Sequence, residues 1–364
     1  MSASPGAWRA PTVAAAMQRP YDNFALIRLS LALAVVVSHA FSVTTGVVAD
    51  EPLAALTGFT LGEHAVNGFF AVSGFLVTMS YDRRGWRNYV IARSLRIAPG
   101  LVAATLVVAL VFGAALTRLP LWDYWRDPAL WRFVAGTLTT FKSNAALPGV
   151  FVDNPFRFPM GTVWTLKYEV LCYLGVLGLG LCGLLRRNAV LILAAGLFCA
   201  VAGLDALRPD APKGMQTAVR LPLIFCLGGL LYLWRDRVRV SALAAVGLAV
   251  LTAVFSGTFL YRTALFTAES YGVLWLALAP GLSRPAFDLK TDLSYGTYLY
   301  GWPVQQALHQ VFPTAAALTL LGPSVVLTLA VAALSWFGVE RPALALKFRS
   351  LGRRTLKTVE PAAP

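Results

Sequence analysis

The chain has 364 residues, of which 57% are hydrophobic and only 13% are charged. A soluble domain is typically about 25% charged, so this composition excludes an ordinary soluble enzyme and indicates a polytopic helical membrane protein. The net charge of +14 arises from basic residues in short segments between apolar runs, which favours membrane topology and anionic lipid head groups over nucleic acid. The four cysteines form no CxxC pair and there are three histidines in all, so we expect neither a metal site nor a tightly bound cofactor.

Ten apolar segments predict an all-α membrane protein with about ten transmembrane helices. Lysine and arginine are concentrated in the segments that face the cytoplasm if both termini lie inside, which predicts that orientation. We expect a cytoplasmic N-terminal segment at 1–23, a membrane domain at 24–342 and a basic cytoplasmic tail at 343–364. The predicted spans are 24–43, 66–80, 98–116, 161–184, 188–204, 218–234, 240–257, 262–280, 293–312 and 317–338.

The first predicted span carries two ionisable residues, Arg28 and His39. A spacing of eleven residues is about 1100° of helix rotation, so both side chains share one face and lie about 16 Å apart along the axis. Ionisable groups in a membrane span are costly, which makes a functional role the default interpretation. We expect His39 to act as an acid–base catalyst and Arg28 to bind an anion near the inner end. An interhelical hydrogen bond of His39 and snorkelling of Arg28 to the inner head groups are the alternatives.

The inner segment before the third span contains Arg93 and Arg96. Residues three apart lie on one side of a helix, and two guanidinium groups there could hold phosphates. The positive-inside rule explains the same arginines equally well.

The fourth span contains Glu169, at about 12 Å from the outer start of that helix at 1.5 Å per residue. His39 is expected at a comparable depth. A carboxylate bonded to an imidazole fixes its tautomer and raises its basicity, so we predict that Glu169 orients His39. A buried packing network is the alternative.

Other polar and aromatic residues of the spans could contact an acceptor or serve packing. Ser73 precedes Gly74 in the second span, where the glycine favours close helix packing. The outer segment 117–160 is rich in Trp, Phe and Pro, which indicates either an interfacial segment or a platform for sugars. The remaining candidates are Tyr173, Tyr298 and Trp302.

Taken together and in this order, these motifs resemble the acyltransferase-3 family of integral membrane acyltransferases over about 24–342. The resemblance implies ten spans with both termini inside. It also implies transfer of an acyl group, usually acetyl from acetyl-CoA, to a carbohydrate hydroxyl on the outer side. In that family the positions of Arg28, His39, Arg93, Arg96 and Glu169 are treated as functional. Many members have a histidine where this chain has Gly301, so any role of that histidine is not carried over.

We therefore expect a multi-pass O-acetyltransferase of the bacterial inner membrane that uses acetyl-CoA as a co-substrate. The CoA phosphates would lie near Arg93, Arg96 and Arg28, and His39 with Glu169 would deprotonate a hydroxyl of an exopolysaccharide or of its lipid-linked repeat unit. Expected partners are acetyl-CoA, the glycan acceptor and membrane lipids, with no nucleic acid. A transporter or flippase of a lipid-linked glycan is the alternative, because intramembrane charges and a broken ninth span would serve it as well.

Overall fold

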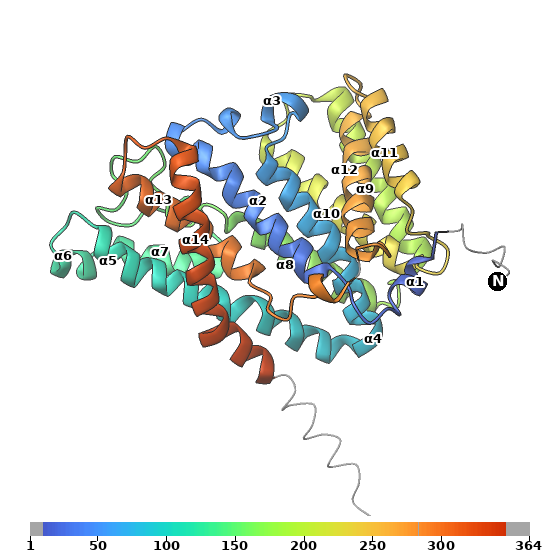
Figure 1. Cartoon of the computed structure of the whole chain (residues 1–364), viewed down its shortest axis with the longest axis horizontal. Coiled ribbons are helices and arrows are strands. Elements are labelled where there is room, and N and C mark those ends of the chain that lie inside the picture. The colour runs from blue at the N-terminus through green and yellow to red at the C-terminus, as the bar shows by residue number, and fades with distance from the viewer. Residues whose placement is uncertain (1–9, 283, 347–364) are drawn as a thin grey trace, which may run out of the picture. The chain divides into compact units, whose positions relative to one another are not determined.

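The computed structural model describes residues 10–282 and 284–346, and over these residues the chain is helical (Figure 1). The described part has no β-strand beyond an isolated bridge between Thr12 and Arg239. Five helices are long and apolar enough to cross a membrane, which confirms the all-α multi-pass fold. The count of ten spans and the cytoplasmic termini stay predictions. Residues 347–364 of the predicted basic tail lie outside the described residues.

The long helices follow the apolar segments closely. Their bounds are α2 Phe24–Thr45, α4 Leu61–Leu106, α8 Trp164–Leu181, α9 Arg187–Leu207, α10 Lys213–Leu233, α11 Ala242–Val254, α12 Tyr261–Leu278, α13 Ser294–Val311 and α14 Ala317–Ser335. The α13 helix is continuous across Pro303.

The second and third predicted spans and the segment between them differ from expectation. They form α4, which passes into a π-helical stretch, Val107–Phe112, and then α5, Gly113–Leu116. Only Gly85 leaves the helical conformation, with φ 70° and ψ 169°. A glycine adopts positive φ without the steric cost of a Cβ atom, so the chain turns at this single residue and stays helical on both sides.

Short elements complete the described chain. They are α1 Val13–Ala16, η1 Val48–Asp50, α3 Ala54–Thr57, α6 Leu121–Arg126, α7 Pro128–Thr140, η3 Pro285–Phe287 and the π-helical η4 Trp336–Glu340. In the outer aromatic segment, Trp122 and Trp131 are exposed and Tyr124 is buried, donating a hydrogen bond to the carbonyl of Ala109 at 2.5 Å.

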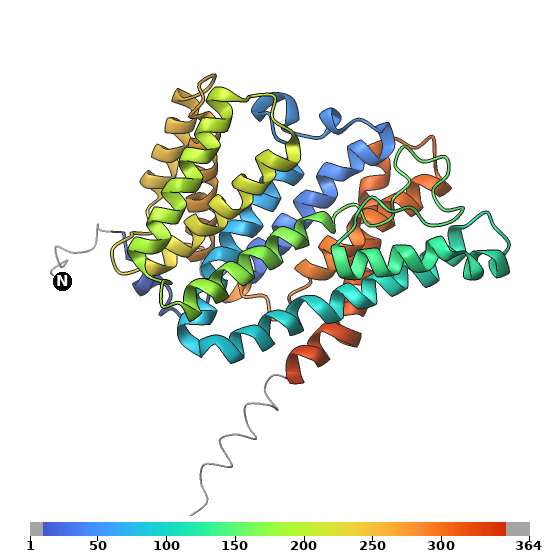
Figure 2. The same ribbon diagram turned by 180° about the vertical axis from the view of Figure 1, so that it is seen from behind.

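The first of two compact units consists of Met1–Leu31, Glu63–Arg83 and Tyr168–Asp292. In it α9, α10, α11 and α12 run side by side in both views (Figure 2). Glycines allow α4 and α10 to touch: a Cβ atom on Gly74 would lie 1.9 Å from the carbonyl oxygen of Phe225. The sequence-based expectation of close packing at Gly74 is thereby confirmed.

The second unit consists of Ala32–Gly62, Arg84–Lys167 and Leu293–Pro364. Its α13 and α14 helices form an antiparallel hairpin, in which a Cβ atom on Gly296 would lie 3.0 Å from the Cα atom of Ala332. Gln306 of α13 anchors the irregular segment before α8. Its side chain accepts from Asn154 Nδ2 at 2.7 Å and donates to the carbonyl of Phe156 at 2.9 Å. Through its part of α2, this unit contains His39.

Candidate active site

His39 lies near the end of α2 and pairs with a buried carboxylate of the second unit. Its Nδ1 atom is 3.1 Å from Oε1 of Glu51, which follows η1. The Glu51 residue is only 4% exposed, whereas the His39 side chain retains 24% of its accessible surface. An ionised carboxylate can only accept hydrogen bonds, so Nδ1 carries a hydrogen, and in the neutral form of the ring the lone pair is on Nε2. Nε2 is therefore the basic nitrogen of this imidazole.

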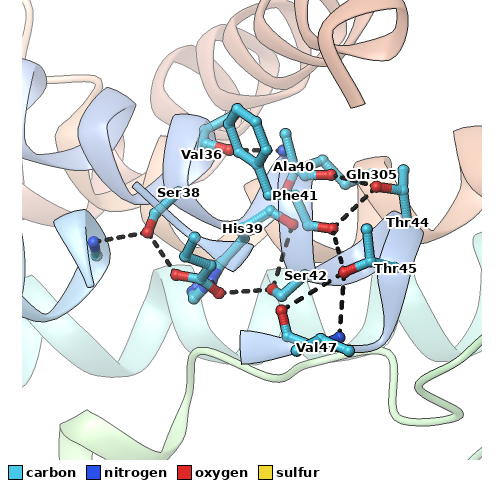
Figure 3. Close-up of polar contacts among 12 residues, drawn as sticks. Val36, Ser38, His39, Ala40, Phe41, Ser42, Thr44, Thr45, Val47 and Gln305 are labelled. Atoms are coloured by element: carbon cyan, nitrogen blue, oxygen red, sulfur yellow. Dashed lines mark hydrogen bonds and ion pairs between the residues drawn. The ribbon is translucent and has the colours of Figure 1, made fainter. Parts of the chain in front are cut away.

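Two serines of α2 hold the Glu51 carboxylate in place (Figure 3). Ser42 Oγ donates to Oε1 at 2.5 Å, and Ser38 Oγ donates to Oε2. Ser38 in turn accepts from the backbone N–H of Gly62 at 2.8 Å. Burial by itself raises the pKa of Glu51, which lies outside the long helices. The hydrogen bond and charge of His39 together with both serine hydroxyls outweigh burial and lower that pKa to about 2. The carboxylate is thus ionised at neutral pH.

The local sequence explains why these groups meet. Ser38 and Ser42 are four residues apart and so lie on one face of α2, with His39 beside them. After α2 the chain turns at Gly46, whose φ of 76° is in the left-handed region, and then passes through η1 directly into Glu51. These turns bring Glu51 onto the serine face.

The α4 helix begins directly against this site. A Cβ atom on Gly62 would lie 3.2 Å from Ser38 Oγ and 3.6 Å from His39 Cε1. A larger residue at position 62 would have to displace Ser38, so glycine allows the N-terminus of α4 to reach the serine hydroxyl.

Trp302 of α13 borders the His39 ring. The two ring centroids are 5.0 Å apart and the planes are nearly perpendicular, at 85°. The indole N–H donates to the carbonyl of Phe158 at 2.8 Å, and the Phe158 ring stacks on the indole at 5.3 Å. One face of the Trp302 indole is thus covered and its N–H is occupied, and a role of Trp302 in contacting the acceptor stays a prediction.

The carboxylate that we expected beside His39 lies in the other unit. Glu169 accepts from Tyr173 at 2.5 Å and from Ser73 at 3.3 Å, so three sequence-predicted residues do come together, but around Glu169. Glu51 is the carboxylate that the structure places at Nδ1 of His39. That Glu169 orients His39 stays a prediction. A separate catalytic role of Glu169 stays a prediction.

The predicted phosphate-binding arginines have partners of different kinds. Arg28 forms an ion pair with Asp292 at 2.7 Å in the first unit. In the second unit, the Arg96 guanidinium lies over the ring of Tyr295, 5.6 Å from its centroid, and Arg93 is three residues earlier on α4. Both arginines are half-buried, and phosphate binding by any of the three stays a prediction.

Tyr298, the remaining candidate, makes contacts within the second unit, and its role in contacting the acceptor stays a prediction. Its hydroxyl lies 2.7 Å from the hydroxyl of Thr165 and 3.0 Å from the carbonyl of Thr162, and the side chain is buried. Tyr298 therefore ties the start of α8 to α13 within the second unit.

Sequence reasoning missed Glu51, although a signal was present. The segment between the first two predicted spans is short and contains three acidic residues, Asp50, Glu51 and Glu63. A short connection keeps its residues close to the end of the preceding helix, so an acidic residue twelve positions after a membrane histidine was a candidate partner.

Comparisons with known proteins identify the family of this chain. The model of the acyltransferase-3 family, described as an acyltransferase domain, matches residues 21–337. The chain is 29% identical to the nodulation protein 10 of Rhizobium leguminosarum bv. viciae, over 92% of this chain and 96% of that protein. It is 24% identical to the O-acetyl transferase of Shigella phage Sf6, over 87% of this chain and 94% of the phage protein. No solved structure matches the chain. Because the family model covers most of the sequence, this chain belongs to the acyltransferase-3 family of membrane acyltransferases.

Proposed function

We propose that the protein transfers an acetyl group from acetyl-CoA to a sugar hydroxyl of a bacterial exopolysaccharide, or of its lipid-linked repeat unit, at the inner membrane. The observation that carries the proposal is the pair of His39 with an ionised, buried Glu51 in a chain of this family. The similarity to a phage O-acetyl transferase supports acetyl as the group transferred.

In the proposed reaction His39 acts first as a base and then as an acid. Nε2 takes the proton of the sugar hydroxyl while the hydroxyl oxygen forms a bond to the thioester carbonyl carbon. As the tetrahedral intermediate collapses, the carbon–sulfur bond breaks and His39 returns the proton to the CoA thiolate. Glu51 holds the ring by Nδ1 and stabilises the imidazolium that exists between these two transfers. An acetyl-histidine intermediate formed at Nε2 is compatible with the same geometry.

The acetyl-CoA phosphates are proposed to bind the basic residues of α4, with the side chains of Arg93 and Arg96 on one side of that helix. Arg28 is a further candidate. Its ion pair with Asp292 would then have to be shared or exchanged for a phosphate when acetyl-CoA binds.

Proteoliposomes supplied with radiolabelled acetyl-CoA and a de-O-acetylated surface polysaccharide test the proposal. We expect label in the polysaccharide with the wild-type protein and none with His39→Ala. Thr45→Ala is the matched control, because Thr45 is an exposed residue on the same helix. Movement of glycan without transfer of label, by protein that remains folded, would contradict the acyltransferase proposal and favour a flippase.

A further inference from the structure

Four of the buried polar atoms that lack a hydrogen-bond partner among the described residues of the second unit follow one another along two neighbouring helices. They belong to two helices, α13 and α14, and we call them the α13–α14 polar cluster: Gln305 Oε1, His309 Nδ1, Ser324 Oγ and Thr328 Oγ1. Each residue is 6% exposed or less. Buried polar groups of native proteins nearly always have a partner, so a group of four without one indicates something that binds there.

The helix register places the four residues close together. Gly301, Gln305 and His309 are four residues apart in turn and form one stripe along α13. A Cβ atom on Gly301 would lie 3.9 Å from Cγ2 of Thr328 on the antiparallel α14 helix. One helical turn further, the same register brings Gln305 level with Ser324. The cluster therefore follows the contact between the two helices.

The cluster adjoins His39 through α2. Gln305 Nε2 donates to the carbonyl oxygen of Val36 at 2.7 Å, and Val36 precedes His39 by three residues, about one turn (Figure 3). Trp302, on the same side of α13, contacts the His39 ring. Since a carbonyl oxygen can only accept, the amide nitrogen of Gln305 must face Val36, and the unpartnered atom must be the amide oxygen.

The neighbouring Gln306 shows that a buried side-chain amide on α13 can have hydrogen-bond partners at both ends. Gln306 is fully buried, and both ends of its amide have partners: the oxygen accepts from Asn154 and the nitrogen donates to Phe156. Leaving a buried acceptor unpaired costs free energy, so Gln305 contrasts with its own neighbour. This contrast indicates a partner that comes from outside the chain.

We propose that the α13–α14 polar cluster binds hydroxyl groups of the acceptor next to the one that reacts at His39. The proposal rests on the function proposed above. Gln305 Oε1 accepts a hydrogen bond, the hydroxyls of Ser324 and Thr328 donate or accept, and His309 Nδ1 does either according to its tautomer. None of these groups carries a fixed charge, so the cluster suits a neutral, polyhydroxylated sugar ring and not a phosphate or a carboxylate.

Steady-state kinetics of Gln305→Leu and Ser324→Ala in proteoliposomes test this subsite, with Gln306→Leu as the matched control. The de-O-acetylated polysaccharide is varied at saturating acetyl-CoA, and acetyl-CoA is then varied in turn. For Gln305→Leu and Ser324→Ala we expect the KM for polysaccharide to rise roughly tenfold, the effect of one lost hydrogen bond, with the KM for acetyl-CoA unchanged. Gln306→Leu should lower the Tm because it breaks the hydrogen bonds of Gln306 to Asn154 and Phe156, without changing the KM for polysaccharide in the folded fraction.

The outcomes separate this inference from the proposed function. An active wild-type protein whose KM for polysaccharide is unchanged in both variants would overturn the subsite and assign the cluster to bound water or to packing. An inactive wild-type protein would instead overturn the proposed function, and the subsite with it. If Gln305→Leu does not fold, Ser324→Ala decides alone, because removing one hydroxyl oxygen leaves the helix contact in place.

Discussion

Replacement of Glu51 by glutamine isolates the charge that the structure places beside His39. Oε1 of Glu51 accepts from both Ser42 and His39, whereas Oε2 accepts from Ser38 only. The glutamine amide can keep its oxygen at the Oε1 position and place its nitrogen toward Ser38, whose hydroxyl can rotate to accept. Glu51→Gln therefore preserves the orientation of the imidazole and removes the negative charge.

The size of the effect follows from the separation of the two charges. The imidazolium that forms during transfer and the carboxylate lie about 4 Å apart between charge centres, which corresponds to about 4 kcal/mol at an effective dielectric constant of 20. At 1.36 kcal/mol for each factor of ten, we expect kcat to fall about 1000-fold. The KM for acetyl-CoA should stay the same, because Glu51 is placed to act on the imidazolium and not on the bound donor.

The assay is acetyl transfer from radiolabelled acetyl-CoA, normalised to folded protein by size-exclusion chromatography. Glu169→Gln is the comparison, since it makes the same chemical change at the carboxylate that Tyr173 and Ser73 bind. A Glu51→Gln protein that keeps kcat within a few-fold of wild type would refute the dyad. A loss confined to Glu169→Gln would return the orienting role to Glu169.

Three further predictions concern the same structure. If Arg28 binds a CoA phosphate, Arg28→Ala should raise the KM for acetyl-CoA at least tenfold, whereas Asp292→Asn, which releases the arginine from its ion pair, should leave that KM unchanged or lower it. Gly62→Val should lower kcat by roughly tenfold without changing the KM for acetyl-CoA, since its side chain would displace Ser38 from the carboxylate, and an unchanged kcat would contradict this. The pKa of Glu51 is about 2 against an ordinary value of 4.5, so its contribution to stability, about 3 kcal/mol, is complete above pH 4.5 and is lost as the pH falls toward 2. The Tm should therefore be lower at pH 4 than at pH 7, and this decrease should be smaller in Glu51→Gln than in the wild-type protein.

The helices could be predicted from the sequence because membrane spans are defined by a local property, the length of an apolar run. The predicted span 24–43 corresponds to α2, Phe24–Thr45, and the predicted span 293–312 corresponds to α13, Ser294–Val311. The segment 81–97 was expected to connect two separate spans, with only Arg93 and Arg96 placed on a helix. It is helical throughout apart from Gly85, which is consistent with arginine being a good helix former.

The candidate site could be predicted only in part. His39 was identifiable because an imidazole in a membrane span is costly whatever surrounds it. Its partner was not, because comparable depth in the membrane does not define a contact between two helices. Glu169 has partners four residues along its own helix and on α4, in Tyr173 and Ser73. The chain returns to α2 through Gly46, whose φ is 76°, and η1, and the residue types of this connection do not predict which of its acidic side chains will reach the serines.

The residues of the proposed acid–base step and those of the proposed acceptor subsite come from different parts of the chain. Ser38, His39, Ser42, Glu51 and Gly62 all lie within one stretch of 25 residues, 38–62, so the acid–base groups are assembled by a single helix end and the turn that follows it. The polar cluster of the proposed acceptor subsite comes instead from α13 and α14, more than 240 residues later in the chain. Substitutions in α13 and α14 could therefore change which sugar is accepted while the His39–Glu51 pair stays intact. This arrangement predicts that exchanging the α13–α14 hairpin between relatives changes the KM for different acceptors, whereas exchanging 38–62 leaves that preference in place. A preference that followed 38–62 instead would show that the acceptor is recognised by the helix end that performs the chemistry.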